Sequence, residues 1–349
     1  MDRQFPRLVI RRDKLRNNFT QIVSRCRACG INVAGVIKGV GGLPEIARLY
    51  KECGAAQLAT SRLEQIELWR REGVDGPFLL LRVPGMSELE SLPHLADYSL
   101  QSDVSTLNAL ENVCARQNLT HKVILMADLG DLREGFWDKA EMIRACCHVE
   151  WELPHLILAG VGVNLGCYGS IVPTPANLGQ LVDIARAVEE QIGRKLEIVS
   201  GGATSSYPLV HRGVMPAGIN HLRIGEAALL AKDLQVDWGI PDMDYLQRGT
   251  IYLEGEIVEL RKKPTYPVGE TMIDAFGRRP SYVDRGTRLR GLVAFGRADA
   301  GDLESLICRE PGMTIIGGDG PTWGIWSPCC PGSRGSPSSA APPTTALWM

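Results

Sequence analysis

The chain has almost no excess charge of either sign, and it lacks a long hydrophobic run. Its 349 residues include 38 Lys and Arg against 40 Asp and Glu, which gives a formal net charge of −2. This nearly equal number of positive and negative charges argues against the basic surface that binds nucleic acids or anionic membranes. Apolar stretches such as 78–83 and 156–163 are far shorter than the roughly 20 residues of a membrane-spanning helix. We therefore expect neither a nucleic-acid nor a membrane partner.

Cysteine is too dilute for a disulfide-stapled fold, and no apolar targeting segment opens the chain. The 10 cysteines are spread over the whole sequence, and Cys53 and Cys114 lie inside apolar stretches. Cys26 and Cys29 form a CxxC pair, but no second pair or His cluster accompanies them to complete a zinc site. Residues 1–4 are polar rather than apolar. These features predict a cytoplasmic protein without a metal site.

Short β-branched runs alternate with amphipathic segments over most of the chain, as in a series of βα units. The predicted strands are 33–38, 57–60, 78–82, 98–101, 122–128, 156–164, 196–200 and 221–224. The predicted helices are 44–53, 62–71, 104–117, 139–149 and 176–192, with a short helix after Ser205. Eight parallel strands, each followed by a helix, are what a closed (β/α)8 barrel of the TIM type requires. A doubly wound open sheet is the alternative, but it usually has fewer strands and a glycine fingerprint after the first.

Helical periodicity fades near Asp237, and short alternating runs follow it. These runs, at 249–260, 271–276, 289–295 and 313–316, predict a C-terminal β domain. A strand at 7–11 could pair with that domain, and a helix is predicted from Asp13. The fold class is thus α/β, with the barrel at residues 13–236, the β domain at 237–316 and the N-terminal strand at 1–12.

The final segment, residues 317–349, has a different composition from the rest of the chain. Of its 33 residues, 17 are Gly, Pro or Ser, and it holds three of the seven tryptophans. No apolar periodicity continues through it, so we expect a tail that is disordered or frame-shifted. A native low-complexity tail is the alternative.

Lys38 ends the first predicted barrel strand and precedes a glycine-rich turn at 39–42. Catalytic side chains of barrel enzymes lie at the C-terminal ends of the strands. Burial there can lower the pKa of a lysine enough for Schiff-base chemistry. The alternative for Lys38 taken alone is a surface lysine at a strand end.

Glycine and hydroxyl residues from Ser200 to Ser206 follow the seventh strand, and Arg223 to Glu226 follow the eighth. Glycines let the backbone approach an anion, while hydroxyls and helix N-terminal amides donate hydrogen bonds to it. Barrels commonly bind a phosphate in the loops after these two strands. By itself such a turn can simply cap a helix. Together with Lys38 across the barrel mouth, it suits pyridoxal 5'-phosphate.

Five stretches of the sequence together resemble the alanine racemase class of pyridoxal-phosphate enzymes. They are residues 33–38, 127–135, 163–169, 200–202 and 220–226, and the likeness extends over residues 5–316. Within this class they are most similar to ornithine racemases. The resemblance implies a barrel followed by a β domain, a homodimer, and a racemase of ornithine or a similar basic amino acid that exchanges protons at Cα through two bases.

The resemblance also implies roles for individual residues. Lys38 matches the lysine that binds the cofactor aldehyde and serves as one acid/base group. Arg223 matches an arginine that faces the pyridine nitrogen of the cofactor. Arg133 matches an arginine that lies near the cofactor's phenolic oxygen and the substrate carboxylate. An ion pair with Asp128 or Asp131 is the alternative for Arg133. The implied cofactor-binding residues are Lys38, Arg133, Asn164, Ser200, Gly201, Gly202, Thr204, Ser205, Arg223 and Gly225.

The second base is where the sequence departs from the alanine racemase pattern. That family uses a tyrosine from the partner's β domain, and the comparable stretch here contains Phe295. Cys167 is our candidate for the second base because a thiol can carry protons, and Tyr168 is a substitute. Packing of a turn is the alternative for Cys167. By analogy alone, Asp274 is expected to approach a partner's site and to suit a substrate with a second amine.

Two other functions remain open at this point. One is a pyridoxal-phosphate carrier or homeostasis protein, which resembles the barrel but lacks the β domain. The other is a metal-assisted D-amino-acid aldolase or dehydratase with the same two-domain plan. That enzyme needs a His and Cys pair in its C-terminal domain, whereas no histidine follows His221 in this sequence.

Overall fold

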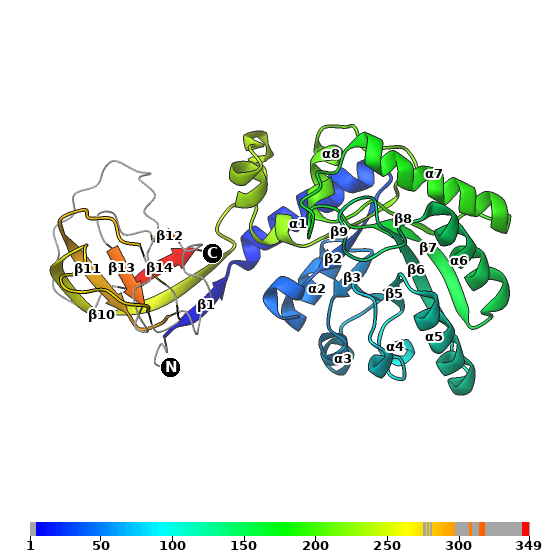
Figure 1. Ribbon diagram of the computed structural model, residues 1–349, viewed down its shortest axis with the longest axis horizontal. Helices are drawn as coiled ribbons and strands as arrows, with labels where there is room; N and C mark the ends of the chain where they lie inside the picture. Colours follow the sequence, from blue (N-terminus) through cyan, green and yellow to red (C-terminus); the bar gives the residue numbers. More distant parts are fainter. Residues whose placement is uncertain are drawn as a thin grey trace. The chain divides into compact units, whose positions relative to one another are not determined.

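The computed structural model describes residues 5–274, 277, 279 and 281–296, together with short strands at 307–308, 314–317 and 344–348. The chain divides into two compact units (Figure 1). We call residues 12–248 the barrel unit, and residues 1–11 with 249–349 the β unit.

Eight parallel strands form a closed barrel, which confirms the (β/α)8 prediction. They are β2 (Asn32–Val36), β3 (Gln57–Thr60), β4 (Phe78–Leu80), β5 (Tyr98–Gln101), β6 (His121–Ala127), β7 (Leu156–Val163), β8 (Ile198–Ser200) and β9 (His221–Ile224). Strand β2 pairs with both β3 and β9, and this pairing closes the ring. Each strand overlaps one of the predicted runs.

The helices lie outside the barrel strands (Figure 1). They are α1 (Arg12–Ala28), α2 (Pro44–Glu52), α3 (Leu63–Arg71), α4 (Leu92–Leu95), α5 (Val104–Gln117), α6 (Lys139–Glu152), α7 (Pro175–Ile192), α8 (Tyr207–His211) and α9 (Glu226–Leu229). Short helical turns lie at η1 (Lys38–Val40), η2 (Met86–Glu88), η3 (Thr204–Ser206), η4 (Asp233–Asp237) and η5 (Pro241–Met243). Sequence periodicity missed α4, which is too short to show a repeat.

Side-chain caps explain where the longer helices begin. The carboxylate of Asp103 accepts a hydrogen bond from Thr106 N at the start of α5, and that of Asp138 accepts one from Glu141 N at the start of α6. Thr174 and Asn177 form a reciprocal capping box before α7. Each cap satisfies N–H groups that the first helical turn leaves without partners.

The barrel is filled by apolar side chains from alternate positions of its strands, as the pleat of a strand dictates. The buried cluster is Ala34, Val36, Ala59, Leu79, Tyr98, Leu100, Ile124, Met126, Ala159 and Ile198. On the opposite face of β2, the rings of Phe19 and Tyr50 stack with centroids 3.8 Å apart. A Cβ at Gly35 would lie 2.6 Å from Tyr50 Cδ2. Glycine is therefore required for α1, which carries Phe19, and α2, which carries Tyr50, to pack on β2.

The described residues of the β unit form one six-stranded sheet. Its strands are β1 (Arg7–Ile10), β10 (Ile251–Pro264), β11 (Thr287–Val293), β12 (Ile307–Cys308), β13 (Thr314–Gly317) and β14 (Thr344–Trp348). Strand β1 pairs antiparallel with β10, which confirms that the N-terminal strand joins the C-terminal sheet. Phe295 is buried in this unit and lies close to Gly255.

One predicted strand is wrong over its described part, and other predictions stay untested. Residues 271–274 form no strand, and residues 275 and 276 lie outside the described residues. Most of the tail at 317–349 also lies outside them, although 344–348 pair with β10 as β14. The domain limits 1–12, 13–236, 237–316 and 317–349 therefore stay predictions. None of the described helices is both long and apolar enough to cross a membrane.

His121 makes the stability of the barrel unit dependent on pH. Its side chain is buried on β6, with Nε2 2.9 Å from Ser99 Oγ. Burial lowers its pKa from 6.5 to about 4, although a backbone hydrogen bond at Ala96 acts in the opposite direction. Because the unfolded histidine binds its proton at higher pH than the folded one, stability is lost as the pH falls from 6.5 towards about 4.

We predict that His121→Gln reduces this acid-induced loss, which amounts to about 3 kcal/mol for one such group. Chemical denaturation at about pH 4.5 and pH 7 gives the difference in unfolding free energy for each variant. His94→Gln, at an exposed position of α4, is the control and should behave as the wild type. An unchanged pH difference in His121→Gln would contradict the assignment.

Candidate active site

A cavity of about 290 Å3 lies at the mouth of the barrel, where the strands end at their C-termini. Side chains from the loops after β2, β4, β6, β7, β8 and β9 line it, as expected for a barrel active site. The structure brings eight of the eleven predicted site residues to this cavity: Lys38, Arg133, Asn164, Cys167, Thr204, Ser205, Arg223 and Gly225. Ser200, Gly201 and Gly202 are not among its lining residues.

Lys38 begins the turn η1 directly after β2. Gly41 and Gly42 follow it with φ values of 63° and 73°, in the left-handed region that glycine adopts without strain. Trp69 Nε1 donates a hydrogen bond to Gly42 O at 2.6 Å and anchors the turn. Lys38 itself is exposed at the mouth, so the burial invoked from the sequence is absent from the single chain.

Arg223, 3% exposed on β9, is the most deeply buried cation of the cavity wall. Its Nη2 donates to Val163 O at 2.8 Å and to Asn164 Oδ1, and its Nη1 donates to Ser200 Oγ. Burial lowers its pKa to about 10, against the opposing charge of Glu134, so the guanidinium is protonated at neutral pH. Its Nε has no acceptor among the described residues, and this donor suits an acceptor atom of a bound cofactor.

Arg133 and Asn164 share Glu134 as a common acceptor. Both Nε and Nη2 of Arg133 donate to the Glu134 carboxylate, and so does Asn164 Nδ2. Burial raises the pKa of Glu134, but these partners together bring it below its usual value. The ion-pair partner of Arg133 is therefore Glu134, not the Asp128 or Asp131 considered from the sequence.

Glu134 is a functional residue that sequence reasoning missed. It joins Arg133 to Asn164, and Asn164 in turn accepts from Arg223, so one hydrogen-bonded chain connects the loops after β6 and β7 to β9. The only sequence indication was the acidic residue directly after Arg133.

Asp131 ties the loop after β7 to the loop after β6. Its buried carboxylate accepts from the backbone N–H groups of Gly166, Cys167, Tyr168 and Ile171 at 2.9 to 3.4 Å. Burial raises the pKa of Asp131, but these four donors bring it below its usual value. The carboxylate is thus charged at neutral pH and holds Cys167 at the cavity. The lining includes Cys167 but not Tyr168, whose side chain is 71% exposed.

The turn after β8 presents unsatisfied backbone donors. The N–H groups of Gly202, Ala203, Thr204 and Ser205 have no acceptor among the described residues, as expected where a helical turn begins. Ala203 to Ser205 line the cavity. Consecutive free N–H groups at a helical start fit a phosphate.

The hydroxyls of this turn differ from the sequence expectation. Ser205 Oγ donates to Leu165 O at 2.7 Å, so its proton is used within the protein. Thr204 Oγ1 accepts from Ala227 N at 3.2 Å and keeps its own proton for a ligand. We therefore assign anion binding at this turn chiefly to backbone N–H groups.

The three predicted residues outside the lining support the cavity from behind. Ser200 Oγ accepts from Arg223 and lies 2.8 Å from His221 Nδ1. A Cβ at Gly201 would lie 2.7 Å from Ile219 Cγ2, and one at Gly202 would lie 2.5 Å from Ser206 Oγ. These close approaches exclude larger side chains.

The lining residues that were not predicted include four beyond the last barrel strand: Glu226, Asp233, Leu234 and Trp238. Glu226 begins α9 beside the predicted Gly225, whereas the other three lie in or directly after η4, beyond the last barrel strand. The sequence offers no motif for them, because only the return of the chain over the mouth places them there.

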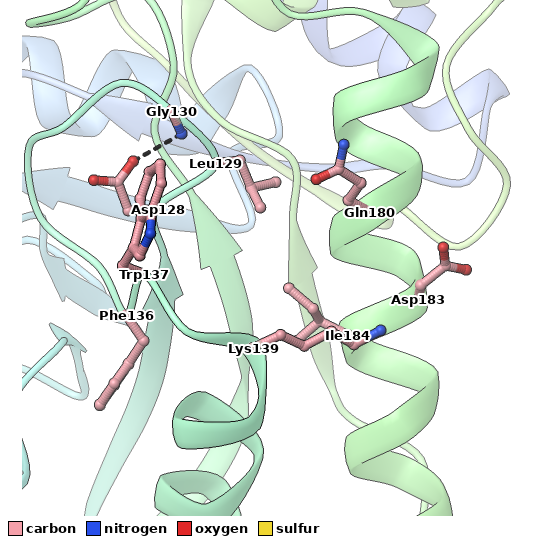
Figure 2. Close-up of a pocket in the computed structure, with 9 residues that line it drawn as sticks. All are labelled: Asp128, Leu129, Gly130, Phe136, Trp137, Lys139, Gln180, Asp183 and Ile184. Atoms are coloured by element: carbon pink, nitrogen blue, oxygen red, sulfur yellow. Dashed lines mark hydrogen bonds between the residues drawn. The ribbon is translucent and has the colours of Figure 1, made fainter.

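A second cavity, of about 340 Å3, lies between the β6–α6 loop and α7 (Figure 2). Its lining residues are Asp128, Leu129, Gly130, Phe136, Trp137, Lys139, Gln180, Asp183 and Ile184. None of the predicted site residues lies in it. Asp128 Oδ1 accepts from Gly130 N at 2.9 Å, the bond drawn in Figure 2, and from Leu132 N at 3.1 Å. These bonds shape the loop that presents Arg133 to the first cavity.

Phe295 and Asp274 both belong to the β unit. Phe295 is 5% exposed within the β unit, and the approach of Asp274 to a partner's site stays a prediction. Among the described residues, no group of three or more His, Cys, Asp or Glu side chains could hold a metal ion.

Residues 10–233 match the family described as "Alanine racemase, N-terminal domain". The chain belongs to the alanine racemase family. It is 36% identical over 315 residues to the lysine racemase of Thermotoga maritima, covering 89% of this chain and 86% of that protein. It is also 36% identical over 313 residues to the ornithine racemase of Acetoanaerobium sticklandii, covering 90% and 87%. The chain is accordingly an amino-acid racemase, of a family whose members are pyridoxal-phosphate enzymes.

Solved structures agree on the fold. The alanine racemase from Bacillus anthracis with bound L-Ala-P superposes with a TM-score of 0.70 at 17% identity, over 100% of this chain and 86% of that one. A D-threonine aldolase from Filomicrobium marinum superposes with a TM-score of 0.60 at 18% identity, over 81% of this chain and 82% of that one. The chain therefore shares its fold with enzymes of more than one reaction type, and these identities carry no argument about the reaction.

We predict that Gly202→Val sharply lowers the affinity for pyridoxal phosphate. Gly202 has φ +114°, and a Cβ there would displace Ser206 and the free N–H groups beside it. Spectroscopic titration of the cofactor into the chain measures the change. Gly213→Val is the matched control, since Gly213 also has positive φ but nothing within 4 Å of a Cβ. If both variants bind pyridoxal phosphate with equal affinity, the turn after β8 does not bind the cofactor phosphate.

Proposed function

We propose that this chain racemises ornithine, lysine or a similar basic amino acid with pyridoxal phosphate bound in the mouth cavity. The observation that carries the proposal is the convergence of Lys38, Cys167, two arginines and a row of free N–H groups on one cavity. The lysine and ornithine racemases that match most of the chain support the substrate class. When bound, the cofactor supplies an aldehyde for the substrate amine and a ring that acidifies the α-hydrogen.

Residues of the chain account for the binding of each part of the cofactor and substrate. The N–H groups from Gly202 to Ser205 hold the phosphate, and Lys38 holds the aldehyde. Arg223 would hold the ring nitrogen through its free Nε, and a guanidinium would take no proton from it. Arg133 receives the substrate carboxylate while Glu134 fixes its orientation. Ser200 and Gly201 act behind these groups, and Asn164 lines the cavity between Arg223 and Glu134.

Two proton carriers reach the cavity from different strands. Lys38 follows β2 and Cys167 follows β7, and β8 and β9 separate these strands on the shorter way around the ring. We assign Lys38 Nζ and Cys167 Sγ to different faces of a bound amino acid, as a two-base racemase requires. Tyr168 is the weaker candidate because its side chain is outside the lining.

The proposed protein is a cytoplasmic homodimer. Cys26, Cys29, Cys53, Cys114, Cys146, Cys147 and Cys167 are free thiols, which suits a reducing compartment. The loops after β6 and β7 expose four large apolar side chains, Leu132, Trp137, Tyr168 and Val172, each at least 61% exposed. Such exposure supports a partner subunit near the mouth.

The alternative functions have less support. A carrier protein lacks the β domain, whereas the lysine and ornithine racemases match 89% and 90% of this chain and therefore extend beyond its barrel. The aldolase and dehydratase structures resemble the chain at 17% to 18% identity.

We predict that Lys38 is the lysine that holds the cofactor. Borohydride reduction of the loaded protein, followed by peptide mapping, should place the pyridoxyl group on Lys38 and on no other lysine. Lys38→Ala should abolish the label, and Lys139→Ala, which lies in the second cavity, should not. A label on another lysine would overturn the assignment.

We predict that Cys167→Ala lowers racemisation by at least about a hundredfold, the usual contribution of a positioned acid/base group. The variant should still exchange the α-hydrogen of one enantiomer in deuterated water, because Lys38 still serves one face. Chiral chromatography and mass spectrometry measure the two reactions. Tyr168→Phe is the control, and racemisation by Cys167→Ala at the wild-type rate would exclude Cys167 as the second base.

A further inference from the structure

Two carboxylates share the mouth cavity with the cationic residues. Glu226 begins α9 and Asp233 begins η4, and both side chains line the cavity together with Lys38. The turn between them contains Ala231, whose φ of +51° lies in the left-handed region. This turn brings Asp233 back to within hydrogen-bonding contact of Glu226.

Lys38 is the cation whose charge acts on Glu226, but it forms no ion pair with that carboxylate. Within the part of the chain that the structure describes, no Lys or Arg forms an ion pair with Glu226 or Asp233, and the adjacent Lys232 pairs with Asp237 instead. Arg133 is already paired with Glu134. The other charged or titratable side chains lining the cavity are Lys38, Arg133, Cys167 and Arg223.

Two adjacent carboxylates repel each other, and this repulsion favours the protonated form of one of them. In agreement, partial burial, the hydrogen bond with Asp233 and the charge of Asp233 raise the pKa of Glu226 to about 7, although Lys38 acts in the opposite direction. A cation placed between the carboxylates would offset the repulsion and favour loss of the proton from Glu226. The pair is thus suited to a positively charged group that enters with a ligand.

The wall beside the pair is apolar. Leu234 is buried, Trp238 is 42% exposed, and both line the cavity next to Asp233. A chain of methylene groups can pack against such a wall while its charged end reaches a carboxylate. Arg223 lines the same cavity, and its Nε has no acceptor among the described residues.

We propose that Glu226 and Asp233 bind the side-chain ammonium of the amino-acid substrate and thereby select diamino acids. The inference rests on the proposed racemase function and names the residues that set its substrate class. In this arrangement Arg133 receives the α-carboxylate, Leu234 and Trp238 contact the methylene groups, and the carboxylate pair receives the terminal amine. An amino acid of the same length without that amine lacks this last contact.

The test compares ornithine with norvaline, which has the same carbon chain but no terminal amine. Glu226→Gln and Asp233→Asn should each raise KM for ornithine by about tenfold to a hundredfold, as expected for one charged hydrogen bond. KM for norvaline should change by less than about twofold. Glu190→Gln, at an exposed position of α7, is the matched control and should leave both unchanged. Equal losses for both substrates, or no loss for either, would overturn the proposal.

A binding measurement separates this proposal from the racemase function. Calorimetry with 1,4-diaminobutane, which has no α-carbon to racemise, should show binding to the full chain with release of a proton near pH 7. Comparison of buffers with different ionisation heats detects that release, and Glu226→Gln should abolish it. If the wild type racemises no amino acid but still shows this release, the racemase proposal fails while the cation site stands. Binding that is identical in wild type and Glu226→Gln removes the cation site.

Discussion

The buried positive charge of Arg223 is the constraint on which the rest of the mouth depends. A guanidinium that is 3% exposed inside the barrel has lost its water, and that loss must be offset by acceptors on the surrounding strands. Val163, Asn164 and Ser200 provide them from the C-terminal ends of β7 and β8. Glu134 adds a negative charge through Asn164. Several residues that do not line the cavity are therefore required to hold this charge at its wall.

The same principle organises the two loops that carry Arg133 and Cys167. Asp131 is charged and 1% exposed, and it is tolerated because four backbone N–H groups from the neighbouring loop solvate it. These bonds fix the backbone around Cys167 without using its side chain. The thiol is left available for chemistry while its position is determined by a carboxylate on another loop.

Sequence reasoning recovered the architecture because the barrel repeats a strong pattern. Apolar strands and amphipathic helices alternate through residues 32–224, and each strand overlaps its predicted run. It was less reliable where local periodicity is weak. Helix α4 is short, and the apolar run at 271–274 forms no strand because a β-branched run specifies a strand only when a neighbour pairs with it.

The sequence by itself determined the barrel, the strand-end position of Lys38 and Arg223, and the family, because these follow from local patterns and from motifs. It could not determine the partners of those residues. The tertiary structure decided these partners. Arg133 pairs with Glu134 rather than Asp128, the Ser205 hydroxyl donates to Leu165 O, and Glu226 forms a hydrogen bond with Asp233. The physical reason is that hydrogen bonds and charge pairs depend on distances of a few ångströms between segments far apart in sequence, and only closure of the barrel sets those distances.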